Sequence, residues 1–271
     1  MTSLPVTKAH AYGNDFLLVP RDGVEGDASA LALAMCHRHH GIGADGLILY
    51  DLHDGGATMT LFNADGSASE LSGNGLRCLA AFVARAQQLT TGSRVAVDTD
   101  AGVKTLEMLG QDGTRVTFRA ALGAPTELRQ VQIPVLGETL TASVLGMGNP
   151  QCVLLGPLPD ADRFHRLGPA LATHPMFPAG TNVEFAHVEA SDRVRILIWE
   201  RGVGPTTSSG TGSSASAVAA AAHGGAARTV DVVAPGGTQR VEWREDGVYL
   251  TGWAEVVLEG DWVGQPAPPS T

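Results

Sequence analysis

Two apolar segments stand out along this chain, and each begins directly after a glycine turn. The first, Leu76 to Leu89, carries apolar residues around most of the circumference of a helix, and the second, Ser213 to His223, is rich in alanine. A helix that is apolar on nearly every side is buried, so the first segment predicts the centre of a domain. The second segment follows the same kind of turn and predicts a second domain with the same plan.

Short apolar and β-branched runs surround both segments and predict strands. Val6 to Val19 reads as a strand broken at Gly13-Asn14, and Arg94 to Phe118 alternates β-rich runs with Asp-Gly and Gly turns, as an antiparallel meander does. Smaller helices are expected at Ala28 to His39, after the candidate N-cap Asp27, and from Asp160 to Leu171. Further strands are expected at 47–50, 59–63, 139–145, 152–155, 182–185 and 194–199, with four strand-like runs between 229 and 258.

Each half therefore reads as strands, turn, buried helix and strands. This internal repeat predicts an α/β (α+β) protein of two pseudo-symmetric domains, with strands wrapped around a central helix in each. Pro125 and Pro134 punctuate the middle of the chain, and we expect the domain junction near residue 120. The N-terminal domain is then 1–120 and the C-terminal domain 121–258, and the sequence leaves open whether the tail 259–271 returns to the first domain.

Composition narrows the range of functions. The 271 residues carry a formal charge of -10, which argues against nucleic acid or an anionic membrane surface as a partner. No apolar run approaches the ~18 residues of a membrane span, and the N-terminus lacks a basic start followed by an apolar stretch, so we expect a cytoplasmic protein. Cys36, Cys78 and Cys152 are odd in number and set in apolar surroundings, which favours buried thiols. The histidines at 37, 39 and 40 have no carboxylate or thiolate at ligand spacing, so no metal site is expected.

The turns before the two buried segments share one pattern. Ser72-Gly73-Asn74-Gly75 opens the first and Ser209-Gly210-Thr211-Gly212 opens the second. Glycines let the backbone approach a ligand, and the free N–H groups of a first helical turn bind anions. Serine, asparagine and threonine are also ordinary N-cap residues, but the repetition of the pattern favours one anionic substrate held in a cleft between both turns.

Several motifs of this chain occur in the order found in diaminopimelate epimerase, and the chain resembles that family over almost its whole length. The motifs are Gly13-Asn14-Asp15-Phe16, Asn63-Ala64-Asp65-Gly66-Ser67, Gly73-Asn74-Gly75-Leu76-Arg77-Cys78, Gly148-Asn149-Pro150, Thr181-Asn182-Val183, Glu200-Arg201-Gly202 and Gly210-Thr211-Gly212. The resemblance implies two domains, each a strand barrel around a central helix. It also implies a bacterial enzyme of lysine biosynthesis that inverts the α-carbon of an amino acid without pyridoxal phosphate or any other cofactor. One cysteine thiolate removes the α-proton in that family, and another cysteine delivers a proton to the opposite face.

The sequence departs from the family at the two reacting positions. Ser72 and Ser209 match the catalytic cysteines, Pro205 stands where the family usually has Glu, and Gln151 stands where it usually has His. A cysteine at a helix start reaches the thiolate state because its ordinary pKa is about 8.5. An alcohol is a far weaker acid, so serine is expected to be a poor base toward an unactivated α-proton.

Four explanations of the serines belong to different classes. The chain is an epimerase whose cysteines were exchanged for isosteric serines, or a natural Ser/Ser member that eliminates or isomerises a more acidic substrate. Alternatively, it uses a carboxylate, with Glu200 as the candidate, as the phenazine-biosynthesis isomerases of the same fold use a single Glu, or it only binds an amino acid or dicarboxylate. The three retained cysteines and the extra serines at 208, 213 and 214 favour natural divergence.

The resemblance also assigns substrate contacts. Asn14, Asn63, Asn149 and Asn182 match asparagines that hydrogen-bond the ligand, and Glu200 and Arg201 match the pair that binds an ammonium and a carboxylate. The first-turn residues complete the expected set of contacts: Gly73, Asn74, Gly210 and Thr211. Arg201 suits a distal carboxylate because its planar fork binds carboxylates bidentately. The expected partner is a small-molecule amino acid or dicarboxylate, with Ser72 and Ser209 facing each other across it, and the sequence leaves the oligomeric state open, a homodimer included.

Overall fold

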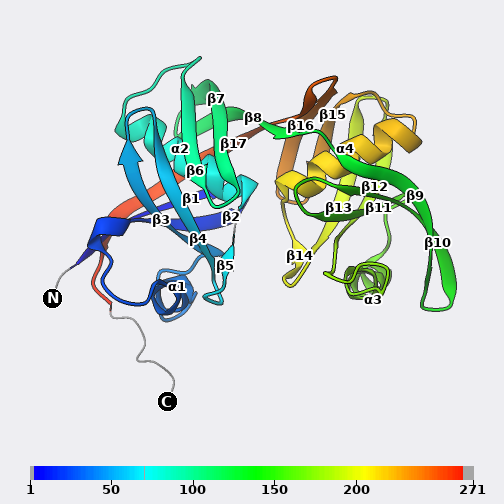
Figure 1. Ribbon diagram of the computed structural model, residues 1–271, viewed down its shortest axis with the longest axis horizontal. Coiled ribbons are helices and arrows are strands. Elements are labelled where there is room, and N and C mark those ends of the chain that lie inside the picture. The colour runs from blue at the N-terminus through cyan, green and yellow to red at the C-terminus, as the bar shows by residue number, and fades with distance from the viewer. Residues whose placement is uncertain (1–2, 70, 265–271) are drawn as a thin grey trace. The chain divides into compact units, whose positions relative to one another are not determined.

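A computed structural model describes residues 3–69 and 71–264, and its chain divides into two compact units. The first unit runs through Ala120 and takes in the chain again from Gly252, and the second unit is Ala121–Thr251. Figure 1 shows one helix with strands around it in each unit.

The strands of the first half are β1 (Leu4–Ala11), β2 (Asn14–Pro20), β3 (Gly46–His53), β4 (Gly56–Asn63), β5 (Ala68–Ser69), β6 (Arg94–Thr99), β7 (Gly102–Asp112) and β8 (Arg115–Gly123). Its helices are the 3-10 turn η1 (Arg21–Gly23), α1 (Ala28–Cys36) and α2 (Gly73–Ala86). The second half contains β9 (Thr126–Val135), β10 (Glu138–Gly146), β11 (Pro150–Leu155), β12 (Asn182–Ala190), β13 (Arg193–Glu200), β14 (Gly204–Thr206), β15 (Thr229–Ala234), β16 (Gly237–Arg244) and β17 (Gly247–Trp262). Its helices are α3 (Ala161–Ala172) and α4 (Gly210–His223).

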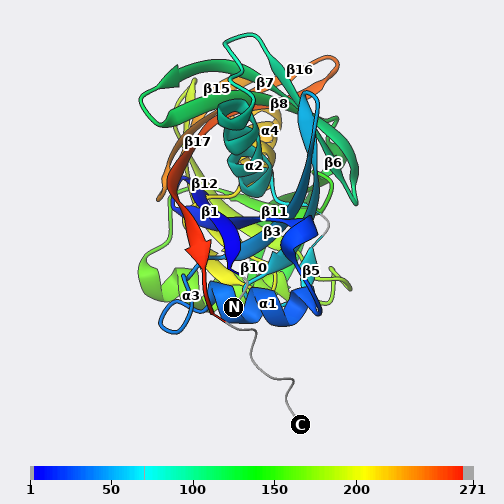
Figure 2. The same ribbon diagram turned by 90° about the vertical axis from the view of Figure 1, so that its left-hand side faces the viewer.

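In the first unit the strands close into a barrel around α2. They pair in the order β1-β2-β3-β4-β6-β7-β8-β17, and β17 pairs back with β1. The helix packs against β1, β2, β3, β4 and β6, and Figure 2 shows it among the strands. Ten of its fourteen residues are buried, because almost every side of α2 meets a strand. The sequence prediction of a buried helix is confirmed here.

The second unit repeats this arrangement around α4. Its strands follow the order β9-β10-β11-β12-β13-β15-β16-β17, and α4 packs against β10, β11, β12, β13, β15 and β16. The α4 side chains are small, and alanines at 215, 217, 219 and 220 pack among valines and isoleucines of the strands. The mixed α/β fold, with a strand barrel around each central helix, agrees with the expectation from the sequence.

A second layer of helix covers the outside of each barrel. Helix α1 packs on β3 and β4, and α3 packs on β9, β12 and β13. Strand β12 consequently has two buried faces: Val183 and Phe185 belong to the core under α3, and Ala186 belongs to the core under α4. Alternation along the strand therefore places Glu184 on the α4 face.

Three boundaries differ from the sequence expectations. Helix α1 ends at Cys36 and not at His39, because the following loop folds back and the N–H groups of Ile42, Gly43 and Ala44 bond to the last carbonyls of the helix. Between Pro125 and Pro134, two prolines expected to punctuate the chain, the structure has the strand β9, which pairs with β10 over most of its length. The second unit ends at Thr251 and not at residue 258, because β17 continues from there as the partner of β1.

The remaining sequence-wide expectations concern cysteines and membranes. Cys36, Cys78 and Cys152 are free and buried, as predicted. Burial raises the pKa of the Cys36 thiol to about 12, and it raises the pKa of the other two as well. In residues 3–69 and 71–264 no helix has the length and apolarity to cross a membrane, and no group of His, Cys, Asp and Glu is arranged to hold a metal ion.

Candidate active site

The two serines cap their helices in the same way. Ser72 is the N-cap of α2 and its Oγ accepts a hydrogen bond from the N–H of Gly75 at 3.1 Å. Ser209 is the N-cap of α4 and its Oγ accepts from the N–H of Gly212 at 3.2 Å. Both hydroxyl oxygens thus lie at the positive end of a fourteen-residue helix and already receive an N–H group. Such surroundings stabilise negative charge on the capping atom.

In the first unit the structure brings Asn14 and Asn74 together. The Asn74 amide donates to Asn14 Oδ1 at 3.0 Å, and the Asn14 amide donates to Asp45 Oδ2 at 2.8 Å. The guanidinium of Arg77, which is 1 % exposed, donates to Asn74 Oδ1. These bonds fix the orientation of both amides.

Asp45 belongs to an ion-pair cluster that the sequence did not reveal. Arg38 donates to Asp15 at 2.9 Å and to Asp45 at 2.7 Å, and Lys8 Nζ lies 2.9 Å from Asp15. Burial raises the pKa of the Asp15 carboxyl, but the hydrogen bonds and charges of Arg38 and Lys8 outweigh burial and lower it. The signal in the sequence was present, since Asp15 and Asp45 both follow glycine turns, but only the parallel pairing of β2 with β3 shows that they meet.

Asn63, another predicted contact, is less closely tied to the others. It ends β4 opposite Gly46 of β3, and its amide donates to Ser67 Oγ at 2.9 Å within the turn that leads to α2. Its side chain is exposed. The turn therefore presents the amide to solvent close in sequence to the start of α2.

In the second unit Asn182 and Arg201 are joined. The Asn182 amide donates to the carbonyl of Pro150 at 3.2 Å and its Oδ1 accepts from the backbone N–H of Arg201 at 3.0 Å. The exposed Arg201 guanidinium donates to the carbonyl of Ala179 at 2.9 Å. Asn182 thus fixes the backbone of Arg201 just after the end of β13. Glu200, the last residue of that strand, is half-buried.

Asn149 and Gln151 line a pocket of about 440 Å³ in the second unit. The Gln151 amide donates to Asn149 Oδ1, and Gln151 Oε1 is buried with no partner among the described residues. The rest of the lining includes Arg129 from β9 and Phe177 from the segment after α3. A glutamine at this position offers both a donor and an acceptor but exchanges no proton near neutral pH.

The remaining predicted contacts lie in the first helical turns. Gly73 and Asn74 begin α2, and Gly210 and Thr211 begin α4. Their backbone N–H groups belong to the set that a helix leaves without an internal partner. Each unit therefore has a serine-capped helix start and its own set of predicted polar contacts, which we call its polar rim: Asn14, Asn63 and Asn74 in the first unit, and Asn149, Asn182, Glu200 and Arg201 in the second.

Glu184 is a buried carboxyl that our sequence interpretation passed over as part of a strand. It is fully buried on β12, on the face toward α4, and neither carboxyl oxygen has a hydrogen-bond partner in the part of the chain that the structure describes. Burial, and then the charge of Glu200, raise its pKa well above the ordinary value. Both effects favour the protonated form of the carboxyl.

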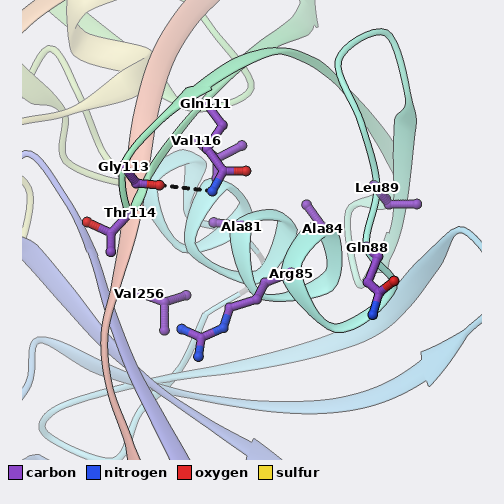
Figure 3. Close-up of a pocket in the computed structure, with 10 residues that line it drawn as sticks. All are labelled: Ala81, Ala84, Arg85, Gln88, Leu89, Gln111, Gly113, Thr114, Val116 and Val256. Carbon is purple, nitrogen blue, oxygen red and sulfur yellow. Dashed lines mark hydrogen bonds between the residues drawn. The ribbon is translucent and has the colours of Figure 1, made fainter.

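A further pocket, of about 460 Å³, lies at the other end of α2 (Figure 3). It is lined by Ala81, Ala84, Arg85, Gln88 and Leu89 of the helix and the residues that follow it, with residues of β7, β8 and β17. The side chains are mostly small or apolar, and the Gln111 amide is bonded to the carbonyl of Gly113 at 2.9 Å. Because this pocket is separated from Ser72 by most of the length of α2, we do not assign the chemistry to it.

Comparison with known proteins now identifies the family. The model of the diaminopimelate epimerase family matches residues 6–126 and 143–257. The chain belongs to the diaminopimelate epimerase family. It is 43 % identical over 277 residues to the diaminopimelate epimerase of Desulforudis audaxviator, covering 95 % of this chain and 98 % of that protein. It is 39 % identical over 280 residues to the diaminopimelate epimerase of Desulfitobacterium hafniense, covering 95 % of this chain and 97 % of that protein.

Solved structures share the fold of this diaminopimelate epimerase family member. A hydroxyproline epimerase from Agrobacterium vitis, with bound trans-4-hydroxy-L-proline, matches with a TM-score of 0.71 at 18 % identity, covering 97 % of this chain and 91 % of that one. A phenazine biosynthesis protein of the PhzF family from Bacillus anthracis matches with a TM-score of 0.73 at 14 % identity, covering 97 % of this chain and all of that one. At these identities the likeness concerns the fold alone.

Proposed function

We propose that this protein is a diaminopimelate epimerase-like isomerase that moves a proton at the α-carbon of an amino acid without pyridoxal phosphate, with Ser72 and Ser209 at the proton-transfer positions. The observation that carries the proposal is the pair of matching helix starts. In each, a serine Oγ receives the N–H of the residue three positions on, at 3.1 Å and 3.2 Å. Membership of an epimerase family, with relatives aligned over 95 % of the chain, supports the class of reaction.

Substrate binding follows from the polar rims of the two units. Arg201 offers a cation to a distal carboxylate, Glu200 offers an anion to an ammonium, and the asparagines orient the neutral donors and acceptors. The N–H groups of the first turns of α2 and α4 suit the carboxylate next to the reacting carbon. The proposal requires that both serines act on that same carbon.

Serine makes the proton transfer harder than cysteine would. The capping N–H group and the helix dipole stabilise an anion at either atom, but a thiol starts from a pKa of about 8.5 and an alcohol starts far higher. We therefore expect the protein to bind diaminopimelate better than it turns it over. A substrate with a more acidic α-carbon would react faster at the same site.

The test is exchange of the α-hydrogen of diaminopimelate in deuterated water, followed by NMR. We expect slow exchange by the protein with both serines, and a rise of about a hundredfold or more in the double variant Ser72→Cys, Ser209→Cys, because general acid-base catalysis by a well-matched group contributes at least that much. The double variant Ser72→Ala, Ser209→Ala is the matched control and should show no exchange.

Other outcomes separate the alternative functions. Exchange as fast with serine as with cysteine would contradict the acidity argument. Loss of activity in Glu200→Gln, with indifference to both serines, would favour a carboxylate-based isomerase. Binding without exchange, even after both cysteines are present, would favour an amino-acid-binding protein and would contradict the proposed function.

A further inference from the structure

Glu184 is placed under the start of α4 by the strand that carries it. It lies two residues into β12, on the face that packs against α4, and it is fully buried. Both carboxyl oxygens lack a hydrogen-bond partner among the described residues. A buried carboxyl without a partner costs several kcal/mol if it is ionised, and less if it keeps its proton. Such a residue requires an explanation beyond packing.

The carboxyl lies near the capping serine. A Cβ added to Gly212 would lie 2.7 Å from Glu184 Oε1 and 3.2 Å from Ser209 Oγ, so both oxygens lie close to one point beside Gly212, although the structure shows no hydrogen bond between them. Gly212 is helical and has no positive φ, so its backbone does not demand glycine. Because glycine has no Cβ, no side-chain atom of residue 212 occupies the space near the carboxyl and the hydroxyl.

The first unit has the same geometry without the acid. Strand β3 is parallel to the strand before it and antiparallel to the strand after it, as β12 is. A Cβ on Gly75, three residues after Ser72, would meet Ile48 Cδ1 at 3.2 Å and Ser72 Cβ at 3.2 Å. Ile48 therefore occupies, under α2, the place that Glu184 occupies under α4. The carboxyl is an addition to the repeated plan and not a requirement of it.

Few charged groups surround Glu184. Glu200, on the neighbouring strand, and Cys152, on β11, are the ionisable groups that interact with it electrostatically. Helix α4 carries no ionisable side chain before His223, and the residue of β13 paired with Glu184 is Ile198. No cation among these groups offsets a carboxylate, so the environment favours the neutral acid.

We propose that Glu184 is a positioning residue that exchanges its carboxyl proton with Ser209. Ser209 at the start of α4 can then be reprotonated by a buried acid, whereas Ser72 at the start of α2 has no such acid beneath it. The proposal rests on the proposed function for the role of Ser209. When Ser209 gives its hydroxyl proton to the substrate carbanion, the O–H bond of Glu184 breaks and the proton moves to Ser209 Oγ, which leaves a carboxylate. In the reverse direction Ser209 Oγ takes the α-proton while its own proton returns to Glu184.

The test uses a thiol as a reporter and needs no substrate. In Ser209→Cys the pKa of the new thiol is read from the pH dependence of its alkylation, with and without the second change Glu184→Ile, which copies the first unit. The three native thiols are buried with raised pKa values, that of Cys36 about 12, so they stay unreactive near neutral pH. Loss of a neutral carboxyl donor should raise the pKa of the thiol at 209, so that its thiolate fraction falls about tenfold.

The opposite results overturn the inference. If Glu184 were ionised, removing its charge would lower the pKa of the thiol at 209, and if the two groups were uncoupled, the pKa would not change. The variant Glu184→Gln gives an independent reading should Glu184→Ile fail to fold: its amide still donates, so the thiol pKa should stay, whereas loss of a carboxylate would lower it. The matched control is Ser72→Cys with and without Ile48→Val, where no shift is expected.

A substrate experiment distinguishes this inference from the proposed function. If diaminopimelate exchanges its α-hydrogen, Glu184→Gln should slow the exchange about tenfold or more, because an amide cannot pass on a proton, while Ile48→Val should not. Absence of exchange in every variant would contradict the proposed function, and the thiol titration would then decide the role of Glu184 alone. An exchange rate unaffected by Glu184→Gln would contradict the relay.

Discussion

At the start of α2 a serine caps the helix above an isoleucine, and at the start of α4 a serine caps the helix above a glutamic acid. Ser72 and Ser209 use the same N–H bond to the residue three positions on, and Ile48 and Glu184 fill the same space beneath. The backbone of the cap is thus repeated, and the chemistry under it is not. The comparison therefore separates two features: the turn and its capping bond are repeated, whereas the buried side chain near the cap is apolar in one unit and a carboxyl in the other.

The two central helices differ in a second way, one turn further in. Arg77 of α2 is 1 % exposed and bonds to Asn74, whereas the matching residue of α4, Ser214, bonds to the carbonyl of Gly210 at 2.9 Å. In the first unit, therefore, the buried guanidinium of Arg77 bonds to the rim residue Asn74. Arg77 Cζ lies 6.0 Å from the centroid of the Tyr12 ring. The second unit uses small side chains, so its interior tolerates the close approach of Glu184.

The largest expected effect comes from removing that guanidinium. Arg77→Met should lower the free energy of unfolding by about 3 kcal/mol. The change removes the hydrogen bond that Arg77 donates to Asn74 Oδ1, and the methionine side chain is smaller and leaves part of the buried volume empty. Chemical denaturation measures the loss. Arg85→Ala, on the same helix but exposed and paired with Glu259 at 2.9 Å, is the control and should cost under about 1 kcal/mol. Equal losses would mean that the buried bond between Arg77 and Asn74 adds no more stability than an exposed ion pair, which would contradict the comparison.

The second prediction concerns Arg201, the cation in the polar rim of the second unit. Arg201→Ala should weaken binding of a dicarboxylic amino acid by about 1.5 to 3 kcal/mol, the contribution of a charge-assisted hydrogen bond. Isothermal titration calorimetry measures it. Arg193→Ala is the matched control, since Arg193 begins β13, the strand that ends just before Arg201, and pairs with Glu189 of β12 at 2.8 Å; binding should be unchanged there. Unaltered affinity in Arg201→Ala would assign Arg201 to the backbone contact with Ala179 alone.

The sequence predicted the parts of this site that depend on neighbours along the chain. The two S-G-x-G turns predicted both helix caps. The apolar run from Leu76 predicted a buried helix, although that helix begins at Gly73, three residues before the run. Asp160 was expected to begin a helix, and its side chain accepts from the N–H of Arg163 at 2.8 Å. Local hydrogen bonds of this kind are encoded within four residues, so they can be found without the fold.

What the sequence did not reveal depends on pairing between distant segments. Glu184 lies in a strand whose neighbours are apolar on both sides, and only the fold shows that its face meets α4. The bond between Asn14 and Asp45 likewise joins strands that the sequence separates by an entire helix. Whether one substrate carbon reaches both serines remains a prediction, and so does the role of each rim residue.

The third prediction uses the pH dependence of stability to sharpen the contrast between Glu184 and Ile48. Burial first, and the charge of Glu200 second, raise the pKa of Glu184 above its ordinary value of 4.5. Between pH 4.5 and the raised pKa the folded protein keeps a proton that the unfolded chain has lost, so the stability relative to Glu184→Gln should fall as the pH rises through this window. Each unit of the shift corresponds to about 1.4 kcal/mol. Urea unfolding at a series of pH values measures it, and parallel curves for the two proteins would show that Glu184 is ionised when folded.

The smallest effect is expected at the caps themselves. Ser72→Ala and Ser209→Ala should each lower the free energy of unfolding by about 1 kcal/mol, because each removes one acceptor for an N–H group of the first turn. The two losses should be similar if the caps are equivalent in structure, and they are measured by the same denaturation. A clearly larger loss at 209 would show that the two caps are not equivalent in structure, although each accepts one N–H group. A larger loss at 72 would contradict the comparison, since Ile48 offers Ser72 nothing that Glu184 does not offer Ser209.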